Sequence, residues 1–128
     1  MIPAILFALA ASTASPLVNP AVTQQNLQST ICTPGWTSTQ RHVSSATKSV
    51  IYDTAGIPKG RRRYWVIDHV IPLEVGGSNN RANLAPQLLA DARRKDVTEN
   101  KAHRDVCAGR VTLVDAQAIF TSDKGTRR

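Results

Sequence analysis

The stretch VIDHVIPLEVGGSNNRANLAPQ, residues Val66 to Gln87, carries the strongest structural pattern in this chain. Its first half is rich in β-branched residues, which predicts a strand over Tyr64 to Leu73. Pro72 has no amide hydrogen to donate to a sheet ladder, so regular pairing should fail near it. The Gly-Gly pair that follows predicts a turn, and Arg81 to Leu84 is expected to form a short return strand.

Asp68 and His69 are adjacent in this predicted strand. Successive side chains of a strand point to opposite faces, so one of the two would be buried among apolar neighbours, where an unpaired charge is costly. We therefore expect either a partner that neutralises the charge or a bend that brings both side chains to one site. A carboxylate beside an imidazole suits phosphodiester cleavage: the carboxylate holds a divalent cation and the neutral histidine takes a proton from water. An Asp-His dipeptide taken alone is more often a surface pair or a structural contact.

Helical patterns flank the predicted hairpin. A short helix is expected within Ser44 to Ala55. A longer one is expected from Asp91, whose side chain can cap its start, to Gly109, a residue type common where helices stop. Another begins at Thr112, where T-L-V-D supplies a capping box. The order strand, turn, strand, helix predicts an α+β fold.

Composition restricts the class of partner. The 128 residues fit one domain. They include 16 Lys and Arg against 9 Asp and Glu, a formal net charge of +7. Such a balance favours polyanionic partners: nucleic acid, anionic lipid or acidic cell-wall polymer.

The N-terminal residues 1–14 are typical of a secretory signal peptide, with an apolar run and then small residues before a cleavage site after Ala14. The run is too short to span a bilayer comfortably, so a secreted or periplasmic protein without stable membrane association is expected once this segment is removed; an N-terminal anchor is the alternative. Residues 15–31 are predicted to be a flexible leader, 32–123 the folded domain and 124–128 a disordered tail.

Two cysteines, Cys32 and Cys107, are far apart in the chain. In an exported protein an even cysteine count favours a disulfide, whereas two separate buried thiols are the alternative if the chain is not exported. Two cysteines cannot supply a four-thiolate zinc site.

The joint pattern D-H-V-I-P-L-E-V-G-G-S-N-N-R-A-N-L, Asp68 to Leu84, resembles the HNH endonuclease motif of the ββα-metal nucleases. The chain is also similar to a small exported branch of HNH-like proteins. That branch begins with C-T-P-G-x-T, as at Cys32 to Thr37, and ends like E-N-K-A-H-R-D-V-C-A-G, Glu99 to Gly109. This resemblance spans nearly the whole predicted domain. It implies a ββα-metal core with a short N-terminal helix, a C-terminal helix and one disulfide.

The resemblance implies roles for individual residues. Asp68 matches a metal ligand and His69 the general base. Asn83 matches the middle asparagine, which steadies the loop and helps to orient the base. A further metal ligand is expected from the long helix, with His103 as first choice and Asn100 as the alternative.

Helical spacing supports this choice of helix face. Asp96, Asn100, His103 and Cys107 are separated by four, three and four residues and so form one stripe. Glu99 lies one turn from His103 and could bind the metal or accept a hydrogen bond from a ligand. A bridge between the two cysteines would pin this helix.

The resemblance further implies a metal-dependent endonuclease that cuts nucleic acid, with double-stranded DNA expected, at low sequence specificity. Mixed carboxylate and imidazole ligands fit Mg²⁺, Mn²⁺, Ni²⁺ or Zn²⁺, and the resemblance implies Mg²⁺ first. Arg81 and the run Arg61, Arg62 and Arg63 could hold flanking phosphates, although the run could equally be an ordinary charged turn. Two alternatives remain: an exported nucleic-acid-binding protein that keeps the HNH fold without catalysis, and a cationic protein of the cell envelope.

Overall fold

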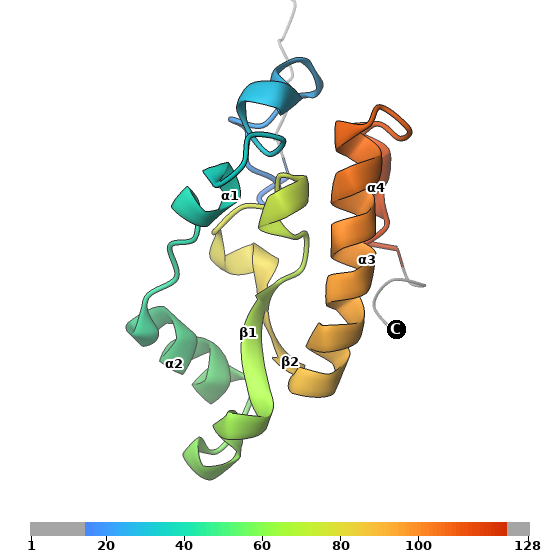
Figure 1. Ribbon diagram of the computed structural model, residues 1–128. Coiled ribbons are helices and arrows are strands. Elements are labelled where there is room, and N and C mark those ends of the chain that lie inside the picture. The colour runs from blue at the N-terminus through green and yellow to red at the C-terminus, as the bar shows by residue number, and fades with distance from the viewer. Residues whose placement is uncertain (1–14, 123–128) are drawn as a thin grey trace, which may run out of the picture.

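The computed structural model describes residues 15–122 (Figure 1). The predicted signal peptide, residues 1–14, and the predicted tail, residues 124–128, lie outside these residues. The α-helices and strands are α1 (Trp36–Thr39), α2 (Ser45–Thr54), β1 (Trp65–His69), β2 (Leu84–Leu88), α3 (Leu89–Cys107) and α4 (Leu113–Ala118). Within residues 15–122 the 3₁₀ helices are η1 (Gln24–Ser29), which precedes α1, then η2 (Lys59–Tyr64), η3 (Leu73–Val75) and η4 (Arg81–Asn83).

The two strands form an antiparallel hairpin in which Trp65 pairs with Leu88 and His69 with Leu84. β1 is shorter than predicted because the chain leaves the ladder after His69, and Pro72 then precedes η3. β2 begins at Leu84 rather than Arg81. The three residues before it form η4, whose start is capped by the Asn80 side chain through the Ala82 amide at 2.9 Å.

The Gly-Gly turn packs tightly against the end of β1. The Gly77 amide donates to the Pro72 carbonyl oxygen at 2.9 Å. A Cβ atom at Gly77 would lie 1.8 Å from the Ile71 carbonyl oxygen, so no side chain fits at this position. Gly76 has a φ of +85°, which glycine adopts without steric cost. The turn therefore requires both glycines.

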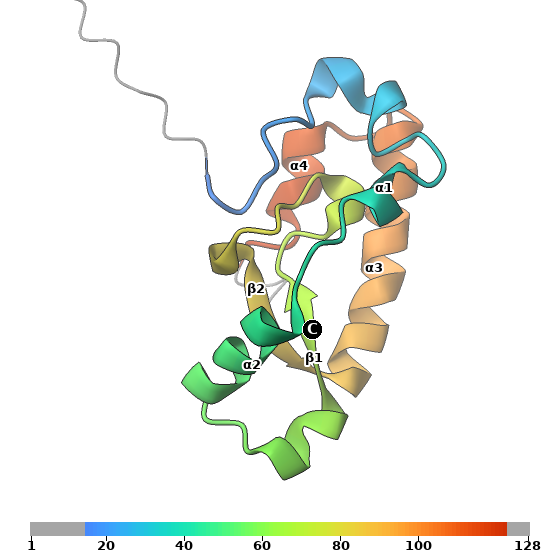
Figure 2. The ribbon, with the colours of Figure 1, turned by 90° about the vertical axis from the view of Figure 1, so that its left-hand side faces the viewer.

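Helices cover opposite sides of the hairpin: α2 packs on β2, and α3 runs along both strands (Figures 1 and 2). The Ser44 hydroxyl caps α2 through the Thr47 amide at 3.1 Å. The predicted cap at Thr112 is present in α4, where its hydroxyl accepts from the Asp115 amide at 3.1 Å. Asp91 does not cap α3, because this helix begins two residues earlier and places Asp91 in its first turn, paired with Arg94.

Residues 15–31 differ from the flexible leader expected from their polar composition. Val22, Leu27 and Ile31 are buried, at 6%, 6% and 2% exposure. They join one core cluster with residues of α3 and α4, including Val106 and Ala116. The segment is ordered because these few apolar side chains fill the space that α3 and α4 leave beside the Gly-Gly turn.

The disulfide between Cys32 and Cys107 is formed, with a Cα–Cα distance of 5.7 Å. It joins the N-terminal segment to the end of α3. The predicted α+β class is also confirmed: helices enclose a two-stranded antiparallel sheet. Within residues 15–122, no helix combines the length and the apolar character needed to cross a membrane.

Candidate functional site

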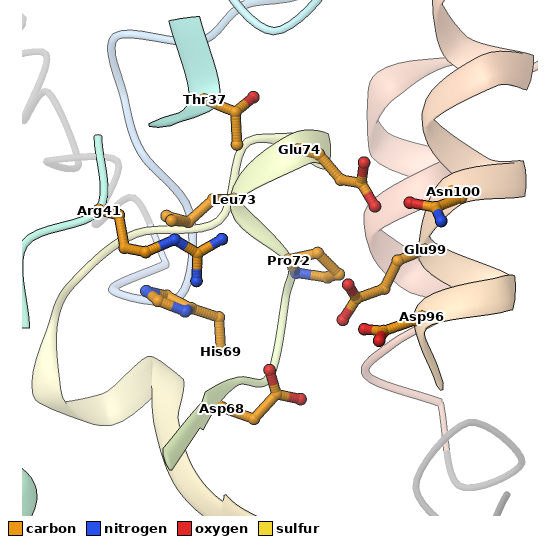
Figure 3. A pocket seen from close by; sticks show the side chains of 10 residues that line it. All are labelled: Thr37, Arg41, Asp68, His69, Pro72, Leu73, Glu74, Asp96, Glu99 and Asn100. Atoms are coloured by element: carbon orange, nitrogen blue, oxygen red, sulfur yellow. The ribbon is translucent and has the colours of Figure 1, made fainter. Parts of the chain in front are cut away.

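A cavity of about 360 Å³ lies where the end of β1 faces α3 and the segment after α1 (Figure 3). Asp68 and His69 both line it, so the chain brings this adjacent pair to one site. The other lining residues are Thr37, Arg41, Pro72, Leu73, Glu74, Asp96, Glu99 and Asn100.

The His69 ring is held by hydrogen bonding in a defined orientation. Its side chain is buried, at 5% exposure, and Nε2 lies 2.8 Å from Asn79 Oδ1. The Asn79 amide nitrogen donates to the Gln40 carbonyl oxygen, which can only accept, and this fixes the side of Asn79 that faces His69 as the carbonyl. His69 Nε2 must therefore carry the proton. In the neutral ring, Nδ1 is left with its lone pair.

The electrostatic surroundings favour the neutral ring. Burial lowers the pKa of His69 below its ordinary value of 6.5. The Asn79 hydrogen bond and the Asp68 carboxylate act in the opposite direction, while the positive charges of Arg41 and Lys95 lower the pKa further. His69 is accordingly an unprotonated base near neutral pH.

Acidic side chains gather on the α3 side of the cavity. Burial raises the pKa of Glu99 to about 7; Lys95 opposes this shift, and the nearby carboxylates Asp68, Asp96 and Glu74 add to it. Burial likewise raises the pKa of Glu74. Carboxylates crowded in this way are stabilised in their charged form by an added cation.

Lys95 provides one such positive charge. Its Nζ lies 2.6 Å from Asp68 Oδ2 and 3.5 Å from Glu99 Oε1, and it also donates to the His69 carbonyl oxygen. The lysine side chain is only 13% exposed. It is the neutralising partner that a half-buried Asp68 requires.

The oxygen-bearing side chains that line the cavity are of the kind that binds a hard divalent cation. Carboxylate and amide oxygens are the ligands that Mg²⁺ and Mn²⁺ prefer, and Mg²⁺ is often bound by one or two carboxylates while it keeps several waters. Asp68 on β1 and Asn100 on α3 both line the cavity and could contribute oxygen ligands. Among residues 15–122, no group of three or more His, Cys, Asp or Glu side chains is already gathered as a metal cluster.

His103, the first choice for a ligand on the helix, is placed away from this cavity. Its Nε2 lies 2.9 Å from the Ile31 carbonyl oxygen and 3.6 Å from Cys107 Sγ. The predicted stripe on α3 therefore divides: Asp96 and Asn100 line the cavity, whereas His103 and Cys107 face the N-terminal segment. Asn100, the alternative ligand, lines the cavity together with Asp68.

Asn83 is fully buried and joins the two ends of the turn. Its Oδ1 accepts from the Ile71 amide at 2.8 Å, and its Nδ2 donates to the carbonyl oxygens of Ile71 and Ser78. The side chain that contacts His69 is Asn79, four residues earlier, and not Asn83. Asn83 thus holds the loop between Ile71 and Ser78 in place, whereas Asn79 orients the His69 ring.

The predicted phosphate-binding arginines do not line the cavity. Arg62 pairs with Asp53 at 2.5 Å and lies 5.0 Å from the centre of the Tyr52 ring. Arg63 stacks on Tyr64, and Arg61 is exposed. All three belong to η2, at the opposite end of β1 from His69. Arg81 donates to the Leu84 carbonyl oxygen at 3.1 Å.

Replacing Asn79 by alanine should lower the activity of His69 without unfolding the protein. The ring would lose the acceptor that fixes its tautomer, so we expect a roughly tenfold fall in the rate of any reaction that uses this base. Asn79→Ala and wild type should be compared in the rate of such a reaction and in thermal unfolding. A large loss of stability with unchanged rate per folded molecule would contradict this role.

Comparison with known protein families, curated proteins and solved structures finds no match to this chain. The site is therefore interpreted from its own geometry and chemistry.

Proposed function

We propose that the protein is a metal-dependent endonuclease of the HNH type, which hydrolyses phosphodiester bonds of nucleic acid with low sequence specificity. The observation that carries the proposal is the buried His69 ring. It is held by Asn79 with Nδ1 unprotonated, beside Asp68 and across a cavity from oxygen donors of α3.

The roles within the proposed reaction follow from this geometry. His69 Nδ1 takes a proton from the attacking water, whose oxygen bonds to phosphorus while the P–O bond to one sugar oxygen breaks; that oxygen leaves and is protonated by solvent. The Asn79 carbonyl, which already accepts from Nε2, stabilises the imidazolium that forms. Asp68 and Asn100 would hold the divalent cation, for which Mg²⁺ or Mn²⁺ fits the oxygen donors best. When bound, this ion would neutralise negative charge on the scissile phosphate.

Charge and disulfide support the proposed substrate and location. A formal charge of +7 on the whole chain favours association with a polyanion such as double-stranded DNA. The contacts expected are mainly with phosphates, and these carry little base information. The Cys32–Cys107 bridge is compatible with an oxidising compartment, so we propose that the protein is secreted or periplasmic.

A plasmid-nicking assay tests the proposed function. Supercoiled DNA is incubated with the purified protein and Mg²⁺ or Mn²⁺, with a matched reaction containing EDTA. The proposal expects conversion to nicked and linear forms that EDTA abolishes. Salt-sensitive DNA binding that survives EDTA, with no cutting in either metal, would instead identify a binding protein without catalysis.

Replacing Lys95 by methionine should strengthen binding of Mn²⁺. The ammonium of Lys95 lies on Asp68, so a cation at this carboxylate must compete with it. Methionine keeps most of the apolar stem and removes the charge, and we expect a roughly tenfold lower dissociation constant, about 1.4 kcal/mol. Calorimetric titration with Mn²⁺ measures this in the absence of DNA.

Two further variants sharpen the Lys95 experiment. Asp68→Asn should weaken Mn²⁺ binding, because it removes a proposed ligand charge. Lys101→Met, which removes an exposed lysine paired with Asp105 elsewhere on α3, controls for net charge. Equal Mn²⁺ affinities of Lys95→Met and Lys101→Met would show that Lys95 does not compete with the metal.

A further inference from the structure

The cavity is electrically divided. Glu74, Asp96 and Glu99 lie on one side of it, with Asn100 (Figure 3). On the other side Arg41 lies next to the His69 ring, close enough for its charge to lower the pKa of that ring. Of the lining residues in the described part of the chain, Arg41 alone carries an ammonium or guanidinium group.

The guanidinium of Arg41 differs in its contacts from those of Arg62 and Arg81. Arg62 is ion-paired with Asp53, and Arg81 donates to a backbone carbonyl. Between residues 15 and 122, no ion pair or side-chain hydrogen bond involves the Arg41 side chain. Its five N–H donors are therefore available to an oxyanion that enters the cavity.

The position of Arg41 is coupled to that of the base. Gln40, its immediate neighbour, accepts the hydrogen bond from the Asn79 side chain that also holds His69. The Arg41 amide in turn lies 3.4 Å from the Ser38 carbonyl oxygen of α1. One short set of contacts thus fixes the backbone at Arg41 relative to the imidazole.

We propose that Arg41 binds the reacting phosphate group of the substrate, on the side of the cavity opposite the acidic residues of α3. This rests on the proposed phosphodiesterase function and adds a substrate-binding residue to it. A planar guanidinium suits a phosphate because it can donate two parallel hydrogen bonds to two phosphate oxygens. A phosphodiester bound by Arg41 would lie next to the His69 ring, the group that activates water.

A small substrate separates this contact from contacts with flanking phosphates. Bis(p-nitrophenyl) phosphate contains a single phosphodiester, so only residues at the reacting group affect its hydrolysis. We expect Arg41→Ala to lower kcat/KM on this compound by about 30- to 100-fold, because it removes a charge-assisted bidentate contact. Arg41→Lys should retain part of the activity, because lysine keeps the charge but not the bidentate geometry. Lys48→Ala, which removes an exposed positive charge on α2, is the matched control and should equal wild type.

The outcomes are distinct. Arg41→Ala hydrolysing the small diester as fast as wild type would overturn the proposal, even if its cleavage of DNA were slower. Thermal unfolding of Arg41→Ala should match wild type, because the side chain has no partner among the described residues to lose.

A binding measurement keeps this inference separate from the proposed catalysis. Diphenyl phosphate, a stable diester, is titrated into wild type and Arg41→Ala in the presence of EDTA, with chemical shifts followed by NMR. Loss of binding in Arg41→Ala supports the phosphate site even if wild type hydrolyses nothing, in which case only the proposed function fails. Equal binding by both proteins would overturn the Arg41 site whether or not DNA is cut.

Discussion

Replacing His69 by alanine is expected to slow metal-dependent cleavage of plasmid DNA by about 10²- to 10⁴-fold, the range that a positioned general base typically contributes. The reason is the single unprotonated nitrogen that Asn79 leaves on the buried ring. Initial rates of nicking at fixed Mg²⁺ measure the effect. Added imidazole should restore part of the rate to His69→Ala if the ring acts as a base.

His42→Ala is the matched control for this experiment. His42 is exposed and follows Arg41 on the segment between α1 and α2, and it does not line the cavity. Its removal should leave the cleavage rate within about twofold of wild type, as is usual for exposed side chains. A His69→Ala protein that is folded and cuts as fast as wild type would show that another group activates the water.

Removing the disulfide should have the largest effect on stability. Cys32 and Cys107 are 75 positions apart, and a bridge that closes a loop of this length is expected to stabilise the fold by about 4 kcal/mol. We expect the double alanine variant to lose about 2–5 kcal/mol in free energy of unfolding and roughly 10–20 °C in Tm. Urea unfolding followed by circular dichroism measures both.

The single variants distinguish the bridge from the packing of its sulfur atoms. Cys32→Ala and Cys107→Ala each break the bridge, so each should lose nearly as much stability as the double variant. Additive losses would assign the effect to packing. A double variant within about 1 kcal/mol of wild type would contradict the expected value.

The sequence predicted the elements whose signals are local. Thr112 and Ser44 each precede a helix and cap it, with a hydroxyl that accepts from the backbone amide three residues later. Hydroxyl residues at helix starts can be recognised in the sequence. The β-branched run before Asp68 likewise indicated β1. The ends of the strands were predicted less well. Composition alone assigns the residues near Pro72 and those of η4 to strands, but in the structure they do not pair in the sheet.

Residues 15–31 could not be placed from their composition. Polar residues separate Val22, Leu27 and Ile31, so no helical or strand period is visible. Their burial depends on apolar side chains of α3 and α4 about 70 or more positions further on, including Val106 and Ala116. Burial that depends on distant parts of the chain leaves little trace in a local pattern.

The same limit applies to the candidate site. Asp68 and His69 were found because they are adjacent. Asn79 and Gln40, whose hydrogen bonds hold the His69 ring, come from two other parts of the chain. Lys95, which neutralises Asp68, comes from a third. The stripe on α3 was visible as a pattern, but a helix of 19 residues passes both the cavity and the N-terminal segment, so spacing could not separate Asn100 from His103.

The bridge between Cys32 and Cys107 turns most of the described chain into a covalent ring, and every residue that lines the cavity lies inside it. A protease that cuts once within the ring, for example in the exposed stretch from Pro58 to Arg61, would leave two pieces still attached to each other. Such a nicked molecule would run as two fragments on a gel only after reduction. In a medium rich in proteases, a single cut of this kind would therefore not separate the two halves of the protein.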